Sequence, residues 1–157
     1  MDEATLCYIV DGEEVLLIEK RRGLGSGLYN GPGGKIESGE TPQEAIVREV
    51  AEEVHIEVHD PTKVGELTFF HDDEIRLFVH VFRSESYQGE PSPSPEARPV
   101  WFHRTELPYD DMWEDDRLWL PLVLEKRQFA GAFVFEGGET LDEASFIDHE
   151  LTLDVSY

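Results

Sequence analysis

Cysteine and long apolar stretches are nearly absent from this sequence. Cys7 is the only cysteine among 157 residues, which excludes an intrachain disulfide and a cysteine-based metal site. Its place in an apolar run predicts a buried, small hydrophobic side chain. No run has the length of a transmembrane helix, and the N-terminus lacks the basic and apolar regions of a signal peptide. We therefore expect one cytoplasmic domain, residues 1–157, with no membrane partner.

Basic residues are also scarce. The chain has 13 Lys and Arg against 35 Asp and Glu, a formal net charge of −22. Nucleic acids and anionic membranes are bound through Lys and Arg, so this charge argues against both as partners. A small polyphosphate held through metal ions remains compatible with it. Because the acids are spread along the whole chain, we hypothesise a halophilic protein, with an acidic mesophilic protein as the alternative.

Short β-rich segments dominate the apolar pattern. They predict strands at residues 5–10, 15–19, 28–31, 56–58, 64–71, 75–83, 100–103, 129–136 and 146–155. The Pro- and Ser-rich segment 85–99 is expected to be a connection within the domain, because the strand pattern resumes after it. A second helix is expected from Asp115 or Asp116 to Lys126, bent or delayed by Pro121. Strands with two helices predict an α+β sandwich.

Residues 41–55 predict an amphipathic helix with a defined start. Thr41 can cap it, Pro42 suits the first helical position, and Glu44 can close a capping box onto the Thr41 amide. Within this helix, Glu49, Glu52 and Glu53 are spaced i, i+3 and i+4, and they therefore share one face.

The shared face of this helix concentrates negative charge. Three neighbouring carboxylates repel one another unless a cation neutralises them, and Glu40 brings a fourth acid close by. Oxygen ligands gathered in this way suit hard divalent cations such as Mg²⁺. The alternative is an ordinary solvated acidic face.

The order of residues around the helix distinguishes the two interpretations. From Gly34, the pattern G-x5-E-x7-R-E-V-x-E-E-x-H-I resembles the Nudix box, in which a glycine stands where this chain has His55. The resemblance implies the Nudix fold, a mixed β-sheet sandwiched between α-helices. It also implies a hydrolase with Mg²⁺ as cofactor, Mn²⁺ being possible.

The resemblance assigns roles to the residues of the box. Glu49, Glu52 and Glu53 are the implied metal ligands, joined by a backbone carbonyl of Gly33 or Gly34. Arg48 is expected to orient a box glutamate. Glu96, on a loop before a strand, matches an acid that serves metal binding or base catalysis. The general base stays open between Glu53, Glu52 and Glu96.

The resemblance extends beyond the box, over segments 20–41, 80–82, 96–102 and 110–135. These segments are similar to the mammalian-type 8-oxo-dGTP diphosphatase (oxidised purine nucleoside triphosphatase) branch of the family. The implied substrate-binding residues are Asn30, Trp113, Asp115, Asp116 and Phe69, with Thr5 and Lys20 as further lining positions.

These residue types fit a flat purine, which needs an aromatic plane and amide or carboxyl groups for its polar edge. Of two adjacent buried carboxyls, one is expected to hold a proton and act as a donor. The alternative for Trp113-Glu114-Asp115-Asp116 is a core Trp beside an ordinary helix cap. Two departures concern substrate preference: Glu114 replaces a proline of the branch, and Leu24 replaces an aromatic residue.

The resemblance therefore implies hydrolysis of oxidised purine nucleoside triphosphates to monophosphate and pyrophosphate, in nucleotide-pool sanitation. Two alternatives are a Nudix hydrolase of ADP-ribose or a dinucleoside polyphosphate, and a non-catalytic nucleotide-sensing module. The expected partner is a small nucleotide, and the expected state is a monomer.

Overall fold

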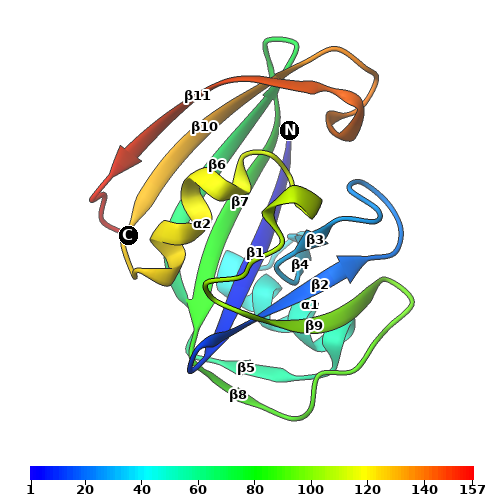
Figure 1. The fold of residues 1–157 in the computed structure, drawn as a ribbon, viewed down its shortest axis with the longest axis vertical. Helices are drawn as coiled ribbons and strands as arrows, with labels where there is room; N and C mark the ends of the chain where they lie inside the picture. The colour runs from blue at the N-terminus through cyan, green and yellow to red at the C-terminus, as the bar shows by residue number, and fades with distance from the viewer.

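The β-rich segments assemble into one mixed sheet of nine strands, shown in Figure 1 for a computed structural model that describes residues 1–157. Its strands are β1 (Asp2–Asp11), β2 (Glu14–Lys20), β3 (Tyr29–Asn30), β4 (Gly33–Lys35), β6 (Thr62–His71), β7 (Glu74–Ser84), β9 (Ala97–His103), β10 (Phe129–Glu136) and β11 (Ser145–Leu153). The order is β11-β10-β6-β7-β1-β2-β3, with β4 paired to β1 and β9 to β2. The pairs β1–β7 and β6–β10 are parallel, and the other pairs are antiparallel.

Two α-helices cover opposite faces of this sheet (Figure 1). They are α1 (Pro42–Val54) and α2 (Asp116–Leu124), accompanied by the 3₁₀ turns η1 (Tyr109–Asp111) and η2 (Leu141–Glu143). Alternate residues of β1 point to the two faces: Tyr8 packs in the core that contains α2, and Cys7 in the core that contains α1. The predicted sandwich of a mixed sheet between helices is confirmed.

Cys7 is fully buried, as predicted, and its burial raises the pKa of the thiol to about 12. A buried thiol of this kind behaves as a small hydrophobic side chain. Neither helix of the structure combines the length and the apolar character needed to cross a membrane.

The connection predicted at residues 85–99 is shorter in the structure, so both of its predicted boundaries are wrong. Ser86–Gln88 form β8, which pairs with β5 (Glu57–His59) in a separate two-stranded sheet. Strand β9 begins at Ala97 because its register with β2 extends to Lys20. Both boundaries are set by pairing with a strand distant in the sequence. Local composition gives no information about such pairing.

The second helix ends before the predicted residue Lys126. Lys126 has a left-handed backbone with φ 60°, and the following amide, of Arg127, donates to the carbonyl of Leu122 at 2.9 Å. This turn satisfies a free carbonyl of the last helical turn and stops the helix. At its other end the helix starts at Asp116, so Pro121 does not delay it.

Helix α1 has the predicted capping box and an unusual C-terminal residue. The Glu44 amide donates to Thr41 Oγ1 at 3.1 Å, and the Thr41 amide donates to Glu44 Oε1 at 2.9 Å. His55 adopts the left-handed conformation (φ 62°, ψ 31°), and its Nδ1 lies 2.8 Å from Ser92 Oγ. The histidine thus occupies a backbone conformation that favours glycine or asparagine.

This conformation generates a stability prediction. We expect His55→Ile to lower the free energy of unfolding by about 1–2 kcal/mol, because a β-branched residue is strained at positive φ. His55→Asn should stay within about 0.5 kcal/mol of the wild type, because asparagine tolerates this conformation. Urea denaturation followed by circular dichroism measures both. Equal losses for the two variants would contradict the backbone explanation.

Candidate active site

A cavity of about 200 Å³ lies beside β1, between the α2 segment and the N-terminal part of the box. All seven residues predicted to bind substrate line it, namely Thr5, Lys20, Asn30, Phe69, Trp113, Asp115 and Asp116. Gly33 and Glu53 line it as well, so the cavity reaches from the predicted base-binding residues to the predicted metal ligands. These residues come from segments far apart in the sequence.

Aromatic side chains form one wall of the cavity. The Trp113 ring meets Phe135 edge-on, with ring centroids 6.2 Å apart, and Phe69 packs on Phe133 at 5.7 Å. Gly25, in the β2–β3 loop, lies against the indole, because a Cβ there would be 2.9 Å from Trp113 Nε1. The glycine lets the loop lie close to the indole ring.

Asp115 and Asp116 are buried side by side at the same end. The indole of Trp119 donates to Asp115 Oδ2 at 2.8 Å, whereas Asp115 Oδ1 and Asp116 Oδ2 are buried without any partner. Burial raises the pKa of Asp115 to about 6. Burial and the charge of Asp115 raise the pKa of Asp116 well above its ordinary value. The raised pKa values favour a proton on one carboxyl of the pair, which would then combine a hydrogen-bond donor with free acceptor oxygens.

The ordinary helix cap is excluded for Asp115. It occupies the N-cap position of α2, but its side chain makes no capping hydrogen bond. Leaving buried carboxyl oxygens unpaired costs free energy, and a purine edge would satisfy them. Asn30 is also fixed nearby: its Oδ1 accepts from the Tyr8 hydroxyl at 3.3 Å and the Gly31 amide at 3.0 Å.

Arg48 organises the acids at the other end. Its guanidinium donates to Glu40 at 2.7 and 2.9 Å, to Glu49 at 2.9 Å and to Glu52 at 3.2 Å. The hydrogen bonds to Arg48 help lower the pKa of Glu40 to about 2. The predicted orienting role of Arg48 agrees with this arrangement.

Glu53 and Glu49 lie against the glycine pair. The Gly33 amide donates to Glu53 Oε1 at 2.8 Å, and a Cβ on Gly34 would come within 2.5 Å of the Glu49 carboxyl carbon. Burial raises the pKa of Glu53 to about 7, and the Gly33 amide opposes that shift. Burial likewise raises the pKa of Glu49.

Two of the predicted carboxylate ligands are more exposed than Glu49 and Glu53. The Glu52 side chain is 61% exposed, and Glu96 is 57% exposed and paired with Arg22 at 3.4 Å. No group of three or more His, Cys, Asp or Glu side chains forms a ready metal cluster. The residues present nevertheless fit a hard divalent cation: Glu49 and Glu53 are carboxylates whose burial disfavours their charge, which a cation would stabilise.

Prediction from sequence missed the contribution of η2. Leu141 is buried and lines the cavity, and the neighbouring Asp142 Oδ2 accepts from the Gly25 amide at 3.2 Å. This bond joins the turn after β10 to the β2–β3 loop, on the side where Leu24 replaces an aromatic residue. No local pattern signals it, because the Gly-Gly turn before η2 is typical of any surface loop.

Comparison with known proteins agrees with this geometry. A model of the NUDIX domain matches residues 2–123. The chain is 44% identical over 140 residues to the oxidized purine nucleoside triphosphate hydrolase of Danio rerio, covering 88% of this chain and 90% of that protein. It is 39% identical over 138 residues to the Mus musculus protein of the same name, covering 87% and 88%. The crystal structure of a MutT protein from Bacillus halodurans superposes with a TM-score of 0.79 at 26% identity, over 96% of this chain and 97% of that one.

The buried pair generates a prediction about pH. An acid with a raised pKa keeps its proton in the folded state but loses it in the unfolded chain, so stability falls as the pH rises above about 4. Asp116→Asn removes this loss. We expect its free energy of unfolding to equal that of the wild type near pH 4 and to exceed it by on the order of 1–3 kcal/mol at pH 8.

Denaturant unfolding at pH 4, 6 and 8 measures this difference. The control is Asp111→Asn, which removes an exposed carboxylate from the same segment. Its stability should follow the wild type at every pH. A constant offset between Asp116→Asn and the wild type would contradict the raised pKa.

Proposed function

This chain belongs to the NUDIX domain family, and we propose that it hydrolyses oxidised purine nucleoside triphosphates such as 8-oxo-dGTP to monophosphate and pyrophosphate. The proposal rests above all on the buried Asp115–Asp116 pair, which lines the same cavity as Trp113 and has carboxyl oxygens without hydrogen-bond partners. The names of the relatives from Danio rerio and Mus musculus support it. Clearance of damaged nucleotides from the precursor pool is the corresponding cellular role.

The base-binding end supplies two kinds of recognition. The Trp113 ring offers a plane on which a purine stacks, and Phe69 closes the wall. The Asp115–Asp116 pair combines a carboxyl proton with carboxylate oxygens, which matches an edge carrying both donors and acceptors. A site that hydrogen-bonds a substrate edge discriminates strongly, because an analogue without those groups leaves buried atoms unpaired.

The carboxylate end supplies the chemistry. Glu49, Glu52 and Glu53, with the Gly33 carbonyl and Glu96, are the ligands we propose for Mg²⁺, Mn²⁺ being a possible substitute. The bound ion would neutralise phosphate charge and lower the pKa of the attacking water. Arg48 holds Glu49 and Glu52 in position, and the Gly33 amide fixes Glu53. Lys20, which also lines the cavity, places a positive charge near the phosphates.

A substrate panel tests the function. We expect 8-oxo-dGTP or 2-oxo-dATP to be hydrolysed with a kcat/KM at least about 10-fold above that of dGTP, since each paired edge group contributes on the order of 1–3 kcal/mol. Pyrophosphate release in the presence of Mg²⁺ is the measurement. Preference for ADP-ribose or a dinucleoside polyphosphate would reassign the substrate within the family. Absence of pyrophosphate release with every nucleotide would indicate a nucleotide-sensing module instead.

The metal assignment has its own test. We expect Glu53→Gln to lower kcat by about 100-fold or more, because it removes a buried carboxylate ligand, while 8-oxo-dGTP still binds in isothermal titration calorimetry. Glu57→Gln, an exposed carboxylate shortly after the same helix, should keep wild-type turnover. Near-normal turnover of Glu53→Gln would refute the role of this residue.

A further inference from the structure

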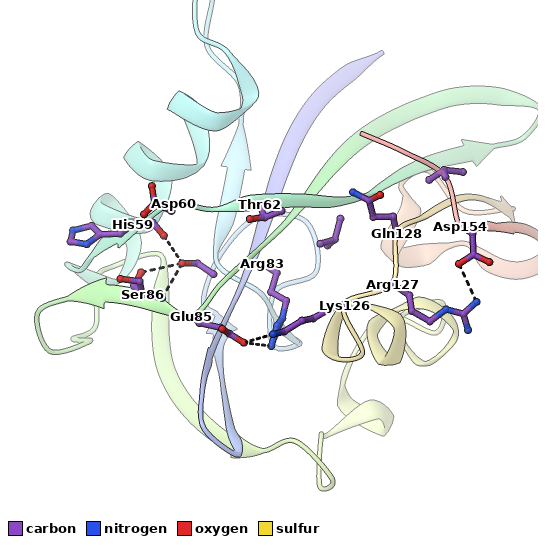
Figure 2. Close-up of a pocket in the computed structure, with 13 residues that line it drawn as sticks. His59, Asp60, Thr62, Arg83, Glu85, Ser86, Lys126, Arg127, Gln128 and Asp154 are labelled. Atoms are coloured by element: carbon purple, nitrogen blue, oxygen red, sulfur yellow. Dashed lines mark hydrogen bonds and ion pairs between the residues drawn. The ribbon is translucent and has the colours of Figure 1, made fainter.

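A second cavity of the protein lies away from the proposed active site. It has a volume of about 730 Å³ and opens between the β5–β6 turn, the end of β7 and the segment that follows α2 (Figure 2). It shares no lining residue with the nucleotide cavity. Only Val64 and Val155 among its lining residues are hydrophobic, so its chemistry suits a polar ligand.

Arg83, near the end of β7, is the unusual residue of this cavity. Its side chain is only 7% exposed, and its Nη2 donates to Glu85 Oε1 at 2.8 Å. The other two guanidinium nitrogens, Nε and Nη1, are buried and have no hydrogen-bond partner. A buried cation with unpaired donors is costly, so an acceptor that reaches these nitrogens would be stabilised strongly. Glu85 neutralises the charge only in part, because its side chain is 57% exposed.

Two further cations converge on the same cavity. Figure 2 shows Arg83 and Lys126 meeting at Glu85, where Lys126 Nζ lies 3.2 Å from the carboxylate. On the other side, Arg127 Nη2 lies 3.4 Å from Asp154. Three of the 13 basic residues of a chain with a net charge of −22 therefore line one cavity. Exposed ion pairs of this kind contribute little free energy, so their cations are available to another anion.

Capping of a helix does not explain Arg83. The last carbonyls of a helix attract cations. At the end of α2 this cation is Arg104, whose Nη2 donates to the Leu124 carbonyl at 2.9 Å. Arg83 makes no bond to a helix carbonyl. Burial lowers its pKa, the charge of Glu85 opposes that shift in part, and the nearby Arg104 adds to it. The charge of Arg83 thus remains incompletely compensated within the protein.

We propose that this cavity is a second binding site, which takes a small phosphate-bearing anion on Arg83, Lys126 and Arg127. Arg83 supplies buried donors, and the two exposed cations exchange their carboxylate partners for phosphate oxygens. Thr62 and Gln128 offer neutral hydrogen-bonding groups at the rim. The inference does not depend on the nucleotide substrate, because the two cavities are separate.

Amide chemical shifts in a two-dimensional NMR titration test the proposal. The full chain is titrated with inorganic phosphate, pyrophosphate and glycerol 3-phosphate in EDTA, which withholds the metal from the proposed active site. We expect at least one probe to shift the amides of Ser86, Lys126 and Gln128 in a saturable manner. The amides of Gly33 and Gly34 report the other cavity. Shifts confined to those glycines, or no saturable shift with any probe, would overturn the proposal.

Variants distinguish binding at this cavity from nonspecific attraction of the anion to basic residues. Arg83→Gln should weaken the saturable binding by about 10-fold or more, as expected for loss of a buried charge-assisted bond. The matched control is Arg76→Gln, which removes an exposed arginine from the same strand and should bind as the wild type. If Arg83→Gln does not fold, the double variant Lys126→Ala and Arg127→Gln carries the test through exposed side chains. Unchanged binding in the folded variants would overturn the proposal.

Discussion

The close approach of helix α1 to the glycine pair of β4 governs the active-site architecture. Glu49 packs its carboxyl group on Gly34, and Glu53 accepts a hydrogen bond from the Gly33 amide. Strand β4 pairs with β1, so the acids are tied to the same strand that lines the proposed active-site cavity through Thr5. A side chain on Gly34 would collide with the Glu49 carboxyl group, which would have to move away from β4.

Carboxyl groups serve opposite purposes at the two ends of this cavity. Asp115 and Asp116 are deeply buried without a basic partner, which favours a retained proton and hydrogen-bond recognition. Around Arg48 the acids are partly exposed and ion-paired, which keeps Glu40 ionised. Carboxyl groups are therefore proposed both for base recognition and for metal binding, and the environment of each group decides which role it suits.

The acidic composition gives the few cations a clear significance. Arg48 binds the box acids, Lys20 lines the proposed active-site cavity, and Arg83 is buried near the end of β7. All three cations therefore lie at or beside a site for which we propose an anionic ligand. Acidic residues outnumber Lys and Arg by 35 to 13, so the molecule as a whole carries a strong negative charge.

The sequence by itself determined the carboxylate helix, its capping box and most strand positions, because these depend on spacing between neighbouring residues. The resemblance named seven substrate-binding residues, and the structure places all seven around one cavity. Only the tertiary structure decided that Asp115 does not cap its helix, that Leu141 reaches the cavity and that Arg83 is buried with unpaired donors. The tertiary structure also decided the presence of β8 and the first residue of β9. All of these features depend on contacts between segments that are distant in the chain. Local propensity does not predict which distant segment a given residue will contact.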